Sequence, residues 1–306
     1  MTFKKMPKRP SKQEETQILE REGIRAFDED IRRFDLNRLT KEFGAASSGR
    51  VILTRVIKNL IWQAVGHVRS GQLAGLDGNL RSFFYTHIKP VMARIPGALE
   101  GARDPYDTML DAFVELVEEY GLVSYVGLDL DDENYHHRKI GERYPHLIVF
   151  AEKVGFFRFL ERLHRDLGVT VAALGGTPSV LSSEYLVRDL AEKTDLAGSF
   201  VALSITDWDP SGSQIAQAQL RQLRSFGIET IQHEALVHPK HYTADEIELF
   251  RFPLPRRQKT KNRNWLEETG GIEGKLFGLE SDSMPRQRLR DLIEKRLAPH
   301  FLGPNG

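Results

Sequence analysis

The sequence contains no cysteine among its 306 residues, and this absence removes several chemistries at once. Disulfide bonds, thiolate metal sites and cysteine nucleophiles are all excluded. Long hydrophobic runs are also missing: no apolar stretch approaches the length of a membrane span. The basic, proline-containing start at residues 1–11 lacks the apolar core of a signal peptide. The expected setting is therefore cytoplasmic, or nuclear if the source is eukaryotic, with no membrane partner.

The chain carries no net charge, because 43 Lys and Arg residues balance 43 Asp and Glu residues. A zero balance argues neither for nor against nucleic acid, so the distribution of charge matters more. Residues 46–99 contain seven basic residues against one acid, and residues 251–263 contain six basic residues and no acid. Such blocks are typical of solvated faces and also of phosphate-binding ones. The basic residues expected to contact DNA are Arg50, Arg55, Lys58, Lys89, Arg94, Arg256, Arg257, Lys259, Lys261 and Arg263.

The first part of the chain has helical periodicity. Residues 1–45 predict an N-terminal arm that is partly disordered and partly helical, with an interruption near Asp35. Ser47 and Ser48 are suitable caps for a further helix that runs to about Val68.

Two more helices and a small hairpin are expected next. The helices lie at residues 80–92 and from residues 104–105 onward. Residues 122–130 alternate like a strand, and we expect them to form a hairpin with residues 137–142. Three helices and a hairpin outline a winged-helix DNA-binding domain over residues 46–141.

From Tyr144 the pattern changes to alternating strands and helices. The expected strands lie near residues 147–150, 169–174, 200–205 and 229–233, with helices between them. This alternation predicts an α/β fold with a mainly parallel sheet and helices on both of its faces, over residues 142–306.

Three acids follow two of these strands. Asp207 and Asp209 come directly after the apolar run at residues 200–205, and Glu152 follows the earlier strand in the same way. The carboxyl ends of parallel strands are where open α/β sheets bind ligands and metals. Carboxylates gathered there are the hard oxygen ligands that Mg²⁺ prefers. The alternative is that Glu152 is a solvated residue and that the Asp pair forms a turn and helix cap.

A tyrosine lies in the first basic block. Tyr85 follows Arg81 by four residues, so both lie on one face of a helix. A tyrosine hydroxyl, with a pKa near ~10, becomes a useful nucleophile when a nearby cation favours its phenolate. The alternative is that Phe83, Phe84 and Tyr85 form an aromatic corner of the core.

Taken together, these elements resemble the A subunit of DNA topoisomerase VI and the meiotic double-strand-break transesterases derived from it. That family joins a winged-helix domain with an Arg-to-Tyr motif to a Toprim domain. The resemblance covers about residues 47–297 in the family's order. The matching segments are 80–85 (LRSFFY), 151–153 (AEK), 175–188 (beginning GGTPS), 206–212 (TDWDPSG) and 275–292 (KLFGLESDSMPRQRLRDL).

By this resemblance, Tyr85 is the nucleophile that becomes joined to DNA through a 5′-phosphotyrosyl bond, with Arg81 assisting. Glu152 and Asp207 hold Mg²⁺, for which Mn²⁺ can substitute, and Asp209 is a third ligand or a second-site acid. The implied partners are double-stranded DNA and a second copy of the chain, because paired cleavage of antiparallel strands needs a two-fold dimer. In the family, each active site combines the tyrosine of one protomer with the acids of the other. Coupling to ATP would require a separate ATPase subunit, since the chain lacks an ATP-binding signature.

The sequence also departs from the family. Trp208 stands where the family usually has Gly, and Phe84 precedes the nucleophile where Tyr is frequent. The short chain puts the contact region for an ATPase subunit in doubt and favours a compact, stand-alone version. Two alternatives stay open: a Toprim nuclease that uses the acids to activate water, and a non-catalytic DNA-binding module. The intact Glu and both Asp residues argue against the second.

Overall fold

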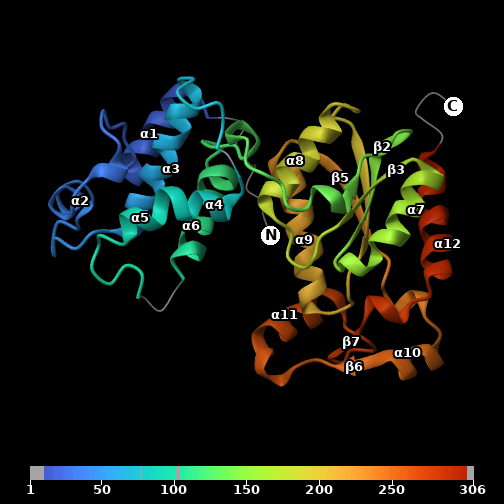
Figure 1. Cartoon of the computed structure of the whole chain (residues 1–306). Coiled ribbons are helices and arrows are strands. Elements are labelled where there is room, and N and C mark those ends of the chain that lie inside the picture. The colour runs from blue at the N-terminus through green and yellow to red at the C-terminus, as the bar shows by residue number, and fades with distance from the viewer. Residues whose placement is uncertain (1–9, 77, 101–103, 302–306) are drawn as a thin grey trace. The chain divides into compact units, whose positions relative to one another are not determined.

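A computed structural model describes residues 10–76, 78–100 and 104–301 of the chain. The chain divides into two compact units, Met1–Glu133 and Asn134–Gly306. The first unit is helical and the second contains a mostly parallel sheet (Figure 1). The predicted mixed α/β class is confirmed. In the described part of the chain, no helix is both long and apolar enough to cross a membrane.

The first unit begins with the expected helical arm. Helix α1 (Lys12–Glu22) starts with a capping box between Ser11 and Glu14. The interruption near Asp35 is a helix start, because the Asp35 side chain accepts a hydrogen bond from the Arg38 amide and caps α2 (Leu36–Phe43).

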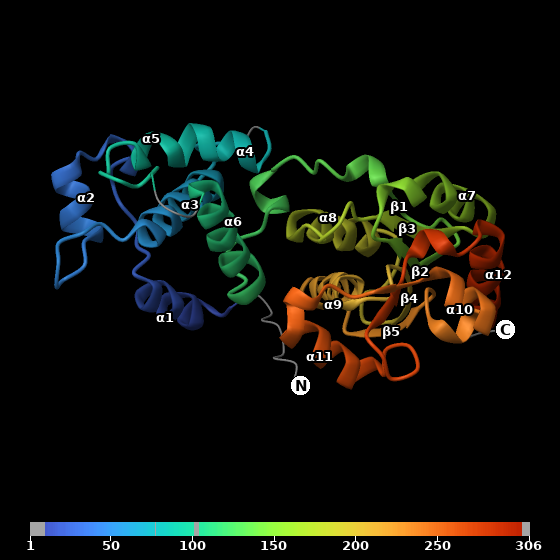
Figure 2. The same ribbon diagram turned by 90° about the horizontal axis from the view of Figure 1, so that it is seen from below.

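Helix α3 (Leu53–Arg69) forms the centre of this unit. It buries an apolar stripe that includes Val56, Leu60 and Ala64. Both views show α3 between α1 and α5 (Figures 1 and 2). The predicted cap at Ser47 and Ser48 is wrong. Those residues lie in a turn that joins the bridged residues Gly44 and Val51, so the helix begins five residues later.

The two remaining helices of the first unit each contain a π-helical turn. Helix α4 (Leu80–Phe83) continues through a π turn at Phe84–Ile88 into α5 (Lys89–Met92). Helix α6 (Pro105–Val114) continues into a second π turn at Glu115–Glu119. Each π turn adds one residue to the helical repeat and changes which side chains share a face.

The predicted hairpin between residues 122–130 and 137–142 is wrong. The first segment forms no strand: it contains a 3₁₀ turn at Val126–Leu128 and a left-handed residue, Asp129. Its apolar side chains are buried in the first unit, so it packs as irregular chain rather than as a two-sided ribbon. The second segment supplies β1 (Arg138–Lys139), which belongs to the sheet of the second unit. The units therefore divide at Glu133, eight residues before the expected position.

The second unit is built on a five-stranded sheet of order β1-β3-β2-β4-β5. The three central pairings, β2 with β3, β2 with β4 and β4 with β5, are parallel, and β1 is antiparallel. The four predicted strands are present. Their bounds are β2 (Tyr144–Ala151), β3 (Val169–Ala173), β4 (Ser199–Ile205) and β5 (Thr230–Ala235).

Helices cover both faces of this sheet (Figure 1). Helices α7 (Phe157–Leu167) and α12 (Arg286–Leu297) contribute to the core on one face, and α8 (Val180–Ala191) and α9 (Pro210–Ser225) to the core on the other. Alternate residues of β2 point into the two cores: Leu147 and Val149 into the first, Ile148 and Phe150 into the second.

A smaller layer lies next to the carboxyl ends of the sheet's strands (Figure 1). It contains α10 (Ala244–Phe250), β6 (Arg251–Pro253), α11 (Lys259–Thr269) and β7 (Phe277–Leu279). Strands β6 and β7 pair antiparallel, and Leu279 also forms a bridge with Trp208, just beyond the end of β4. This bridge fixes the chain after β7 next to the carboxyl ends of the central strands.

Candidate functional site

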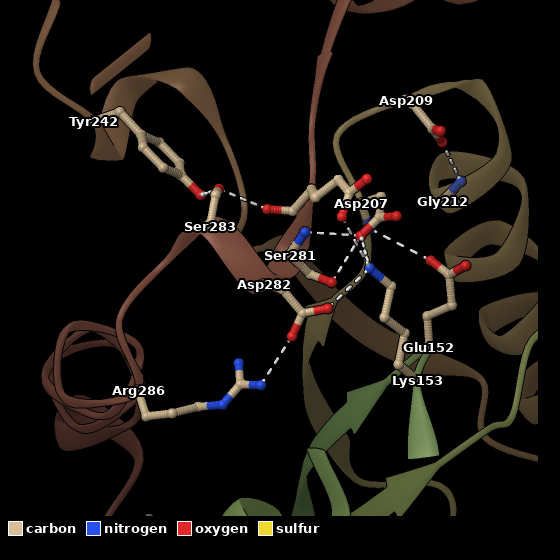
Figure 3. A network of polar contacts seen from close by, with 11 residues as sticks. Glu152, Lys153, Asp207, Asp209, Gly212, Tyr242, Ser281, Asp282, Ser283 and Arg286 are labelled. Carbon is tan, nitrogen blue, oxygen red and sulfur yellow. Dashed lines mark hydrogen bonds and ion pairs between the residues drawn. The ribbon is translucent and has the colours of Figure 1, made fainter. Parts of the chain in front are cut away.

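Glu152 and Asp207 meet at the carboxyl ends of two neighbouring strands. The register of β2 and β4 pairs Ala151 with Ile205, so the residues that follow both strands emerge at one edge. The Glu152 amide donates to the Ile205 carbonyl at 3.1 Å. The Asp207 amide in turn donates to Glu152 Oε2 at 3.4 Å (Figure 3). The structure thus brings the two predicted acids together.

Asp207 is held in place by three donors on one of its oxygens. Its Oδ1 accepts hydrogen bonds from the amide and the hydroxyl of Ser281, each at 2.7 Å. Lys153 Nζ lies 3.1 Å from the same oxygen. Because Ser281 is fully buried, the carboxylate has a fixed orientation.

Asp209 is the N-cap of α9. Its Oδ1 accepts from the Gly212 amide at 2.7 Å, and Pro210 occupies the first turn of the helix. Figure 3 shows this carboxylate directed at Gly212. The capping role that the sequence left open is therefore real. It leaves the other oxygen of Asp209 for a ligand, and the charge of Asp209 still acts on Glu152.

The crowding of acids shows in the pKa of Glu152. Partial burial, followed by the neighbouring charges of Asp207 and Asp209, raises this pKa above its usual value. A cation beside these carboxylates would oppose the raised pKa of Glu152, because it would stabilise the ionised form. The donor set, carboxylate oxygens at a partly open strand edge, fits a hard divalent cation such as Mg²⁺, with Glu152 and Asp207 as its ligands and Asp209 nearby.

The geometry is nevertheless not a closed ligand set. Within the described ranges, no group of three or more His, Asp or Glu side chains converges as it would around a bound metal ion. Instead the ammonium of Lys153 lies among the acids. Burial alone would lower the pKa of Lys153, but hydrogen bonds to Asp282 and Asp207 outweigh burial and raise it.

Sequence reasoning missed three residues of this site: Ser281, Asp282 and Lys153. Asp282 Oδ2 lies 3.1 Å from Lys153 Nζ, and Glu280 Oε2 lies 3.9 Å from it. The resemblance described above includes residues 280–282 only as part of the family's C-terminal segment. The usable signal was its pattern, because the short apolar run at Phe277–Leu279 is followed at once by acids, as in the other two strands.

Tyr85 lies in the first unit, in the π turn at Phe84–Ile88. Its side chain is 51% exposed, whereas the preceding Phe84 is buried and packs edge-on against the Tyr85 ring. The alternative of a core corner therefore describes Phe83 and Phe84 and not Tyr85. A side chain with this exposure is accessible to a large substrate.

The cation on the Tyr85 ring is Lys89, whose Nζ lies 4.7 Å from the ring centroid. Arg81, which was expected to assist Tyr85, instead lies over the ring of Tyr106, at 4.9 Å. Burial raises the pKa of Tyr106, and the charge of Arg81 opposes that shift. Arg81 therefore contacts a ring of α6, and the residue four positions from Tyr85 that does contact its ring is Lys89.

The residues expected to contact DNA divide into exposed and internal ones. Lys58 is a correction: it is only 7% exposed and pairs with Glu22 at 2.7 Å and Glu115 at 2.8 Å, so it stabilises the first unit. Arg94 donates to the backbone carbonyls of Arg32 and Phe34. The exposed members are Arg50, Arg55, Lys89, Arg94, Arg257, Lys259 and Arg263.

Two further members of that set lie in the second unit. Lys261, on α11, donates to the Ser211 hydroxyl at the start of α9, at 2.9 Å. The side chain of Arg256 lies outside the described part of the structure.

Comparison with protein-family models and with curated proteins found no match to this chain.

Proposed function

We propose that the protein cleaves DNA by Mg²⁺-dependent transesterification, with Tyr85 as the nucleophile. The observation that carries this proposal is the contact between Glu152 and Asp207 at the ends of two adjacent parallel strands. Cleavage of a phosphodiester needs a cation that neutralises the phosphate oxygens, and this edge supplies the acids that would hold one. The exposure of the Tyr85 side chain supports the choice of nucleophile.

In the proposed reaction the phenolic oxygen of Tyr85 attacks the DNA phosphorus. The new bond joins Tyr85 Oη to phosphorus, and the bond from phosphorus to the 3′-oxygen breaks. The phenolic proton is lost and the leaving 3′-oxygen gains a proton, so a free 3′-hydroxyl and a 5′-phosphotyrosyl ester result. No water is consumed, and the step is reversible in principle because one phosphodiester replaces another.

Each part of the chain has its own task in this proposal. A bound Mg²⁺ would stabilise the charge that develops on the leaving oxygen. Glu152 and Asp207 would hold it, with Asp207 kept in place by Ser281. Lys89 would keep the Tyr85 ring in position. Arg81 would act at Tyr106, beside the nucleophile rather than on it.

The finer architecture belongs to the same proposal. The first unit is a winged-helix-like DNA-binding domain without the expected wing, and the second is Toprim-like. Exposed basic residues of both units would contact DNA phosphates, and two copies of the chain would cut the two strands. Any coupling to ATP would come from a separate ATPase subunit.

End-labelled duplex DNA tests this function. With Mg²⁺ or Mn²⁺, label should stay with the denatured protein, and Tyr85→Phe should abolish both linkage and cleavage while DNA binding persists. Tyr135→Phe is the matched control, because Tyr135 is also exposed (62%) and lies in the other unit. Cleavage that survives Tyr85→Phe and leaves free phosphate ends would instead support the water-using nuclease. Binding without any cleavage would support the non-catalytic module.

A further inference from the structure

Lys153 lies in the middle of the acid cluster rather than at its rim. Its Nζ lies 3.1 Å from Asp207 Oδ1, 3.1 Å from Asp282 Oδ2 and 3.9 Å from Glu280 Oε2. Figure 3 shows the side chain reaching from the end of β2 towards Asp207 and Asp282. One ammonium thus links the end of the central sheet to the chain after β7.

The segment after β7, which carries Asp282, is itself held in place by further contacts. Asp282 also pairs with Arg286, at 3.0 Å. The adjacent Ser281 binds Asp207 through both its amide and its hydroxyl. The bridge between Trp208 and Leu279 holds this whole segment in register with the end of β4. Several contacts therefore fix the position of the Lys153 ammonium, so that it does not depend on one ion pair at the surface.

Acids lie on two sides of Lys153. On one side lie Glu152, whose Oε2 accepts from the Asp207 amide, and Asp209, whose charge acts on Glu152. Glu280 and Asp282 face Lys153 from the other. Because Asp207 Oδ1 already accepts three donors, a metal ion that uses Asp207 must bind its other oxygen. Two positions for positive charge result, and Lys153 fills one of them.

We propose that Lys153 takes the place of a second metal ion, so that this site binds one divalent cation and not two. The inference rests on the proposed function, since it specifies the metal stoichiometry of the same site. The bound ion would lie with Glu152 and Asp207. A second ion would have to enter between Asp207 and Asp282, where the ammonium already makes the ionic contacts and would repel it.

Binding of Mn²⁺ to the full chain, counted by electron paramagnetic resonance, tests the inference without a measurement of cleavage. The wild-type protein should bind one Mn²⁺. Lys153→Met keeps the length of the side chain and removes its charge, and it should bind a second Mn²⁺. Lys153→Arg keeps the charge and should bind one. Lys193→Met is the matched control, because Lys193 pairs with Glu142 on the surface of the same unit.

Asp207→Asn locates the signal, since it should remove the binding seen in the wild-type protein. Thermal unfolding of each variant identifies any that fails to fold, and Lys153→Arg then carries the comparison. Two ions in the wild-type protein, or a single ion in a folded Lys153→Met variant, would overturn the inference and leave the proposed function intact. No Mn²⁺ binding by the wild-type protein would instead overturn the metal-dependent function itself.

Discussion

The acid site and the tyrosine segment are held in place in different ways. Three separate stretches of chain build the acid site, and the register of β2 with β4 and the bridge at Leu279 determine where its side chains lie. Tyr85 lies on one short helical segment, half exposed, and its nearest cation is only four residues away. Long-range pairing therefore makes the first site rigid, whereas local helix geometry alone decides the surroundings of the second.

The largest expected effect concerns the rigid site. Gly212 lies so close to Asp207 that an added Cβ would be 2.1 Å from the Asp207 carbonyl oxygen. Gly212→Ala should lower the free energy of unfolding by about 3 kcal/mol, the upper end for forced overpacking. It should also weaken Mn²⁺ binding, because the turn that carries Asp207 and Asp209 must move. Urea unfolding and the Mn²⁺ titration measure the two effects.

The control is Gly155→Ala, in the same unit, where an added Cβ would meet no atom within 4 Å. It should change stability by less than about 0.5 kcal/mol. Equal stability of the two variants would contradict the rigid description of the acid site.

The next effect probes the helical unit. Lys58→Met leaves Glu22 and Glu115 without their shared cation, next to the Tyr120 hydroxyl, which lies 2.9 Å from Glu22 Oε1 and 2.7 Å from Glu115 Oε1 and can donate to one of them at a time. Because the two acids keep some contact with solvent, we expect a loss of about 2 kcal/mol, less than for a fully buried pair. Urea unfolding measures it, with Lys41→Met on the exposed side of α2 as the control. A loss no greater than that of the control would show that the ion cluster adds no stability.

The same cluster predicts a pH dependence of smaller size. Burial alone would raise the pKa of Glu22, but hydrogen bonds from Lys58 and Tyr120 outweigh it and hold the pKa below its usual 4.5. A carboxylate with a lowered folded-state pKa contributes stability above its unfolded pKa and loses it as the pH falls through the folded value. The urea midpoint should therefore drop below pH 4.5. Glu22→Gln should show a smaller drop, by roughly 0.5–1 kcal/mol, and an unchanged pH profile would count against this assignment.

The smallest expected effect concerns Lys89, the cation that contacts the Tyr85 ring. Lys89→Gln removes this cation. An exposed cation–π contact is worth roughly 0.5–1 kcal/mol, which corresponds to about a threefold change in rate. We expect the rate of covalent linkage to DNA to fall by that factor at saturating DNA. Arg55→Gln, another exposed basic residue of the same unit, should alter DNA affinity without that change in rate. A rate that does not respond to Lys89→Gln would assign the cation–π contact to packing alone.

The contrast between the two sites also explains which features could be predicted from the sequence and which could not. The four strands and the edge where Glu152 and Asp207 meet were predictable, because apolar runs and strand order are enough to place strand ends. Lys153 and Asp282 were not, since their pairing depends on how the chain after β7 returns to the sheet. The contact of Arg81 was not predictable either, because its partner Tyr106 lies on another helix, α6. The missing wing has a simpler reason: residues 122–130 alternate in sequence but bury nearly all their apolar side chains in irregular chain.

The bridge between Trp208 and Leu279 has a consequence for the order of folding. Ser281 follows Asp207 by 74 residues, so during synthesis the acids at the strand ends are made well before the donors that orient them. Until the β7 segment arrives, Asp207 lacks Ser281, and Lys153 lacks its contact with Asp282. The acid site is therefore complete only when β7 docks, so the proposed metal ion would bind only once the second unit is nearly finished.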